Sequence, residues 1–163
     1  MKRESLLIVI ALVAGCSKSD EKSESQGGDA SDTWSVSKIV DGDTIWVTDE
    51  SGDEVKVRLI GIDTPESGRC GFDEATAELE SLISGSSIEL VEGGIDDVDK
   101  FGRLLRYVEV DGNDVGLAMI KSGWAIARYD SRDGYGEHLQ EESYVEADES
   151  SENKCPDSAW FSE

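Results

Sequence analysis

Alternating apolar and polar positions predict several short strands in the chain. Residues 34–40 and 44–48 are rich in β-forming side chains and flank the turn sequence Asp-Gly-Asp. Residues 54–62 resume the alternation after a Gly-containing turn, so the second and third segments are predicted to form a hairpin. Residues 87–91 and 104–110 are predicted to form two more strands.

Helical spacing of apolar residues begins after the third strand. Between Phe72 and Ile83 apolar residues recur every three or four positions, and Gly85 ends the pattern. Residues 113–122 are predicted to form a short helix and residues 134–149 a polar one. Five strands and three helices in this order predict an α+β domain built on a small closed barrel.

The predicted hairpin determines which residues face each other across its two strands. With the turn centred near residue 51 or 52, position i faces a position of about 103 minus i, because the strands are antiparallel. Arg58 then faces Ile45, and Asp43 faces Ile60. Asp63 lies three residues beyond Ile60. That separation is about 10 Å at roughly 3.3 Å per residue.

Charged side chains are predicted to gather at the end of this hairpin. A bulge or bend at Gly61 would bring Asp63 nearer to Asp43 than a straight strand allows. Glu66 follows Pro65 where the chain leaves the sheet. The predicted cluster contains Asp43, Arg58, Asp63 and Glu66.

These residue types suit the hydrolysis of a phosphodiester. Carboxylates with a backbone carbonyl favour a hard cation, Ca²⁺ before Zn²⁺. Arginine binds phosphate through paired hydrogen bonds, and a free carboxylate can orient or deprotonate a water molecule. Metal-assisted attack of water on a phosphodiester follows. Taken alone, each motif (residues 41–44, 58–66 and 99–103) is also typical of an ordinary turn or strand end.

Composition and charge exclude several kinds of binding site. The 163 residues are enough for one small domain, and 37% of them are hydrophobic. One histidine and three cysteines exclude a His-rich or four-cysteine zinc site. With 37 acidic and 15 basic residues the formal charge is -22, which excludes a basic nucleic-acid-binding groove at the level of overall charge. The acidic excess indicates either a solvated surface or adaptation to molar salt. At molar salt the repulsion between acidic side chains is screened beyond about 3 Å. We favour the second interpretation.

The first 33 residues are predicted to precede the folded domain. A basic pair and an apolar run at 6–14, too short to span a membrane, are typical of a signal peptide covering residues 1–15. The run ends Val-Ala-Gly-Cys, which resembles the lipobox of prolipoproteins and predicts a lipid on Cys16. The alternative is an ordinary cleaved signal with an incidental cysteine. Residues 16–33 are expected to tether an exported domain, residues 34–163, to the outer face of the membrane.

Two cysteines remain once Cys16 is set aside. In an exported protein Cys70 and Cys155 are expected to form a disulfide between the loop before the first helix and the C-terminal tail. Two free thiols are the alternative. Closing a loop of about 86 residues stabilises a fold by roughly 4–5 kcal/mol on the chain-entropy model.

The three charged motifs, in this order, resemble the staphylococcal (micrococcal) nuclease, or thermonuclease, family over about residues 36–139. The resemblance implies an OB-fold five-stranded β-barrel with three helices and a Ca²⁺ cofactor. It also implies an endonuclease that cuts DNA, and RNA as well, to 3′-phosphorylated products. We expect this nuclease to act as a monomer.

The resemblance also implies roles for individual residues. Arg58, Glu66 and Arg103 match the catalytic positions, with the two arginines on the phosphate and Glu66 as general base. Asp43 and Asp63 match the Ca²⁺ carboxylates, and Thr64 matches the residue whose backbone carbonyl binds the metal. The remaining matches are Asp41 and Thr44 in the outer shell of the metal and Lys100, Phe101 and Tyr129 at nucleotide-contacting positions.

Two departures from the family pattern lie in the nucleotide-binding region. Phe101 stands where the family often has a tyrosine, and Ser131 replaces the second tyrosine of the base-binding wall. Two other functions compete with a nuclease: an OB barrel that binds oligonucleotides without cutting them, and a surface module that binds Ca²⁺ structurally. The intact set of carboxylates and arginines favours the enzyme.

Overall fold

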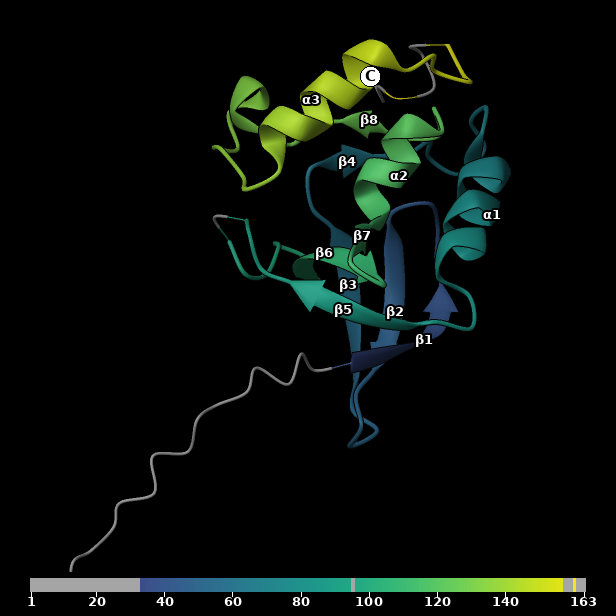
Figure 1. Ribbon diagram of the computed structural model, residues 1–163, viewed down its shortest axis with the longest axis vertical. Helices are drawn as coiled ribbons and strands as arrows, with labels where there is room; N and C mark the ends of the chain where they lie inside the picture. The colour runs from purple at the N-terminus through teal and green to yellow at the C-terminus, as the bar shows by residue number, and fades with distance from the viewer. Residues whose placement is uncertain (1–32, 95, 157–159, 161–163) are drawn as a thin grey trace, which may run out of the picture. The chain divides into compact units, whose positions relative to one another are not determined.

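Five strands close a barrel in the computed structural model, which describes residues 33–94, 96–156 and 160 (Figure 1). They pair in the order β3-β2-β1-β5-β6, and β3 and β6 close the ring as parallel neighbours. Buried aliphatic side chains such as Ile45, Val57 and Ile88 fill the interior, since alternate residues of a barrel strand point inward. The strands are β1 (Thr33–Ile39), β2 (Thr44–Thr48), β3 (Glu54–Leu59), β5 (Ser87–Val91) and β6 (Leu104–Val110).

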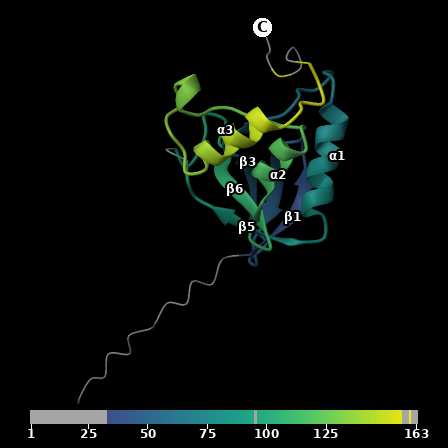
Figure 2. The same ribbon diagram turned by 45° about the horizontal axis from the view of Figure 1, so that its top comes forward.

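Three helices pack on the barrel: α1 (Phe72–Ile83), α2 (Val115–Lys121) and α3 (Glu141–Ser150). Helix α2 contacts both α1 and α3 and also packs on β6 (Figure 2). Asp114 begins α2, because its side chain accepts a hydrogen bond from the backbone N–H of Leu117. The predicted α+β class, with a five-stranded barrel and three helices, is confirmed. None of the helices in the described part of the chain is long and apolar enough to cross a membrane.

The predicted signal peptide, the lipid on Cys16 and nearly all of the predicted tether lie outside the described residues. Strand β1 begins at Thr33, which is the last residue of the predicted tether.

The third strand ends earlier than its pattern predicted. Gly61 has a positive φ of 72°, a conformation that glycine adopts without strain, and the chain bends there. Residues Ile62–Asp63 form a separate strand, β4, which pairs with β8 (Ile126–Ala127). Arg58 holds the bend, since its guanidinium donates hydrogen bonds to the carbonyls of Leu59 and Ile62 over 2.8 and 3.0 Å. The prediction of one continuous strand over residues 54–62 was therefore wrong, whereas the predicted bend at Gly61 is present.

The hairpin register differs by one residue from the prediction. Thr44 pairs with Arg58, where the prediction placed Ile45. The side chain of Asp49 accepts hydrogen bonds from the backbone N–H groups of Ser51 and Asp53, which centres the turn on residue 51. The corrected register still brings Asp43 to the bend, because its carbonyl accepts a hydrogen bond from the N–H of Leu59 over 2.9 Å.

Two of the predicted helices begin later than expected. Residues Asn113–Asp114 form strand β7 on the edge of β6, and the helix follows them. Residues 134–140 are irregular, since Gly134 and Gly136 have positive φ angles of 84° and 90°. His138, which was expected in the last helix, lies before it. There it is buried and hydrogen-bonded through Nδ1 to the hydroxyl of Tyr107 over 2.7 Å.

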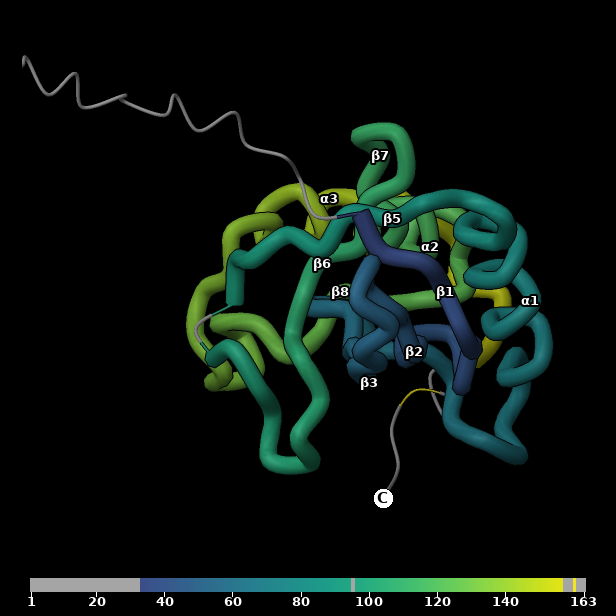
Figure 3. The backbone as a smooth tube through the Cα atoms, turned by 90° about the horizontal axis from the view of Figure 1, so that it is seen from below, coloured from purple at the N-terminus to yellow at the C-terminus, as the bar shows by residue number. Residues whose placement is uncertain are grey.

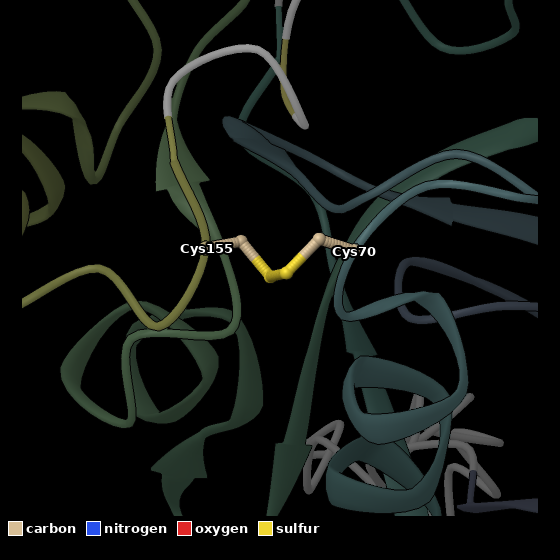
Figure 4. Close-up of a disulfide and its surroundings, with 2 residues drawn as sticks. All are labelled: Cys70 and Cys155. Atoms are coloured by element: carbon tan, nitrogen blue, oxygen red, sulfur yellow. A yellow bond between two sulfur atoms is a disulfide. The ribbon is translucent and has the colours of Figure 1, made fainter.

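Cys70 and Cys155 are joined by a disulfide, with their Cα atoms 5.9 Å apart (Figure 4). Cys70 lies directly before α1 and is exposed, whereas Cys155 is buried. Cys155 packs with Ile126 and Trp160 in a second small apolar cluster outside the barrel. The bridge therefore connects the loop before α1 to the C-terminal tail.

Candidate active site

A cavity of about 640 Å³ lies at the end of the β2–β3 hairpin. The connection between β5 and β6 extends from the barrel in Figure 3. It contributes to the cavity wall Asp96, Val98, Asp99, Lys100, Phe101 and Arg103. Residues were predicted to catalyse the reaction, to hold the metal or to bind nucleotides. Among them, within the part of the chain that the structure describes, Thr44 alone does not line this cavity. The predicted residues that line it are Asp41, Asp43, Arg58, Asp63, Thr64, Glu66, Lys100, Phe101, Arg103 and Tyr129.

Two buried carboxylates face one guanidinium at the base of the cavity. Asp43 and Asp63 are 7% and 5% exposed. The Nη2 atom of Arg58 lies 3.0 Å from Oδ2 of Asp43 and 3.5 Å from Oδ1 of Asp63. The N–H and hydroxyl of Thr64 also donate to Oδ2 of Asp43, over 3.2 and 2.8 Å. The bend at Gly61 thus brings Arg58 of β3 and Asp63 of β4 to Asp43, which directly precedes β2.

Burial makes the negative charge of Asp41 and Asp63 unfavourable, and the guanidinium of Arg58 offsets only part of that cost. Burial raises the pKa of Asp63 to about 6, and the negative charge of Asp43 adds to the rise while Arg58 opposes it. Burial and the charge of Asp43 also raise the pKa of Asp41 to about 6. A cation bound between these carboxylates would therefore stabilise their charged forms. The carboxylate oxygens of the site are ligands that suit Ca²⁺. Within residues 33–94, 96–156 and 160 no three His, Cys, Asp or Glu side chains form a metal-binding group, so carbonyl or water oxygens would complete the shell.

We expect Asp63→Asn to stabilise the metal-free protein at pH 7.5. The pKa of Asp63 is raised from 3.8 to about 6, so its stabilising contribution is present below pH 3.8 and is lost as the pH rises through 6. Such a change corresponds to at most about 3 kcal/mol. Thermal unfolding in EGTA should show a midpoint several degrees higher for the variant at pH 7.5, and no gain below pH 4. A lower midpoint at pH 7.5 would contradict the raised pKa.

Arg103 is connected to the same carboxylates through Thr44. Its Nη1 atom donates to Oγ1 of Thr44 over 3.4 Å, and that hydroxyl donates to Oδ1 of Asp43 over 3.0 Å. Asp99 orients Arg103, since its carboxylate accepts from the Nε and backbone N–H groups of Arg103 over 2.7 and 2.9 Å. Sequence reasoning assigned no role to Asp99, although its spacing of four residues from Arg103 was visible.

Exposed groups form the rim of the cavity. Glu66 is exposed and has its carboxylate available to solvent. Phe101 is 72% exposed, and the ammonium of Lys100 and the guanidinium of Arg103 lie 5.0 and 5.4 Å from its ring centre. An exposed ring beside two cations presents both a stacking face and positive charge.

Two tyrosines form an aromatic wall on another part of the rim. The hydroxyl of Tyr129 donates to Oδ1 of Asp63 over 3.2 Å. Its ring meets Tyr135 edge to face, with ring centres 5.3 Å apart. Ser131 instead donates hydrogen bonds to Glu141. Sequence reasoning missed Tyr135, whose one signal is its place between two glycines in an irregular segment.

Carboxylates and arginines that share one cavity at the end of a barrel strand suit the hydrolysis of a phosphodiester. The model of the family described as "Staphylococcal nuclease homologue" matches residues 56–153, and this chain belongs to that family.

Curated relatives support the same conclusion. The chain is 28% identical over 150 residues to an "Uncharacterized endonuclease" of Haemophilus influenzae, a match that covers 92% of this chain and 72% of the relative. It is 36% identical over 100 residues to the "SPbeta prophage-derived endonuclease YokF" of Bacillus subtilis, covering 58% of this chain but 33% of the relative. It is 30% identical over 103 residues to the "Thermonuclease" of Staphylococcus intermedius, covering 60% and 61% of the two chains.

Proposed function

We propose that the protein is a Ca²⁺-dependent endonuclease that hydrolyses phosphodiester bonds in DNA, and in RNA as well. The observation that carries the proposal is the meeting of buried Asp43 and Asp63 with Arg58 and Arg103 around a single cavity. A structural Ca²⁺ site would leave the two arginines without a purpose. A substrate phosphate would give both guanidinium groups a partner that accepts paired hydrogen bonds beside the metal.

Asp43, Asp63 and the backbone carbonyl of Thr64 would hold the cation, with Asp41 and Thr44 around them. When bound, Ca²⁺ supplies positive charge beside the phosphate and orders a water molecule. Arg58 and Arg103 would bind the phosphate oxygens and stabilise the charge that develops on them. Glu66, exposed on the rim, would take a proton from the attacking water.

The proposed reaction balances as a hydrolysis. The oxygen of water bonds to phosphorus, its proton passes to Glu66, and the bond from phosphorus to the 5′ oxygen breaks. The 5′ oxygen takes up a proton from bulk water, and Glu66 returns its proton to bulk water. The products are a 3′-phosphate and a 5′-hydroxyl. The neighbouring nucleotides would be held at the rim by Lys100 and by three aromatic rings that stack on bases, those of Phe101, Tyr129 and Tyr135.

We also propose that the enzyme is exported and acts as a monomer at the cell surface, anchored through a lipid on Cys16. The lipobox-like sequence and the polar stretch after it support this location.

The test is cleavage of a fluorescent single-stranded DNA in Ca²⁺ and then in EGTA, with Glu66→Gln as the variant. We expect cleavage in Ca²⁺, none in EGTA, and a loss of at least about 100-fold in the variant, because the base can no longer accept a proton. Glu142→Gln, an exposed acid on α3, is the matched control and should cut normally. Ca²⁺-dependent binding without cleavage would instead indicate an oligonucleotide-binding module.

A further inference from the structure

Arg128 contacts Asp63 of the carboxylate cluster, and its guanidinium lies 5.5 Å from the ring centre of Tyr129. It follows β8 directly, and its backbone N–H donates to the carbonyl of Gly61 over 2.9 Å. Its Nη1 atom lies 3.6 Å from Oδ2 of Asp63. The other oxygen of Asp63, Oδ1, faces Arg58 and Tyr129, which both line the cavity, whereas Arg128 is not among the described residues that do. The two oxygens of Asp63 are therefore contacted by two different guanidinium groups.

The C-terminal tail holds the guanidinium of Arg128. Its Nη1 atom donates to the carbonyl oxygen of Trp160 over 3.2 Å. The side chain of Trp160 is 3% exposed and packs against Ile126 and Cys155. Cys155, which packs against Trp160, is itself bonded to Cys70, so the disulfide anchors one partner of the residue whose carbonyl contacts Arg128 (Figure 4).

We propose that Arg128 is a positioning residue for Asp63, and that the tail closed by the disulfide keeps Arg128 in place through the carbonyl of Trp160. The inference rests on the proposed function, in which Asp63 binds Ca²⁺. The guanidinium has two opposite effects on such a site: its charge competes with the cation, and its contact fixes the orientation of the carboxylate. Our assignment is that orientation dominates, as for groups behind other metal ligands, whose loss weakens metal binding about 10–100-fold.

Calorimetric titration of the full chain with Ca²⁺ tests the assignment without measuring turnover. Arg128→Met removes the charged head and keeps most of the stem. We expect Ca²⁺ affinity to fall about tenfold. Lys121→Met, which removes an exposed positive charge from the last turn of α2, is the matched control and should leave the affinity unchanged. Tighter or unaltered Ca²⁺ binding in Arg128→Met would overturn the proposal.

The contribution of the tail is tested by replacing both Cys70 and Cys155 with serine. We expect a similar loss of Ca²⁺ affinity, and no further loss when Arg128→Met is added, because both changes act through one contact. Additive losses would show that the disulfide acts elsewhere and would overturn the coupling. The Arg128→Met protein keeps the disulfide, so its titration decides the positioning role even if the serine variant does not fold. A wild-type chain that binds no Ca²⁺ would overturn the proposed function itself.

Discussion

Arg103→Ala should lower the rate of DNA cleavage by at least about 100-fold and leave the fold intact. The guanidinium lies at the cavity wall and is oriented by Asp99, so it can meet a phosphate without rearrangement. Its side chain is 24% exposed, and a partly exposed ion pair contributes only about 0–1 kcal/mol to stability. Loss of charge stabilisation in the transition state therefore outweighs any loss of folding energy. Initial rates in saturating Ca²⁺, with the unfolding midpoint measured on the same preparation, check both parts.

The matched control for this variant is Arg106→Ala. Arg106 contacts the same β5–β6 connection through ion pairs with Asp97 and Glu92, but it is not among the described residues that line the cavity. We expect it to cut at nearly the wild-type rate. Wild-type turnover in Arg103→Ala would contradict the phosphate-binding role assigned to Arg103. Equal losses in the two variants would mean that the ion pairs of the connection matter, and not a contact with substrate.

The strands and the cluster could be predicted because both depend on local patterns. Short stretches of five to seven residues predicted four of the five barrel strands closely, and the bend at Gly61 brought Asp63 to Asp43 as expected. A register error of one residue did not move the cluster, because Arg58 is long enough to reach both carboxylates from its actual position opposite Thr44.

The missed features depend on contacts between residues far apart in the sequence. Strand β8 has two residues and exists through its pairing with β4, so no periodicity marks it. Tyr135 reaches the aromatic wall because positive φ angles at Gly134 and Gly136 keep the segment out of the helix that its polar pattern predicted. His138 is drawn into the core by Tyr107, which is 31 residues away in the sequence. Such contacts are decided by packing and leave no signal in a short window of sequence.

The charge of the protein leads to the second large prediction, which concerns salt. Binding of a basic protein to duplex DNA weakens with a log–log slope of about -0.9 per phosphate contact. At six to ten contacts the loss is about 10³–10⁵-fold between roughly 50 and 200 mM salt. The present chain has a formal charge of -22, so its long-range interaction with DNA is repulsive and added salt screens that repulsion. The attractive contacts of Arg58, Arg103 and the aromatic wall act at short range and are screened much less.

We therefore expect cleavage of single-stranded DNA to persist or rise from about 50 mM to about 2 M salt, where the Debye length is below roughly 3 Å. The measurement is kcat/KM at a fixed concentration of free Ca²⁺ across that series. A substrate with a single phosphodiester is the control, because it carries too little charge to be repelled strongly, and its rate should vary less with salt. A steady decline for DNA, with a negative log–log slope like that of a basic nuclease, would mean that the acidic surface is not an adaptation to salt. In that case phosphate contacts beyond the two arginines of the cavity would have to hold the substrate.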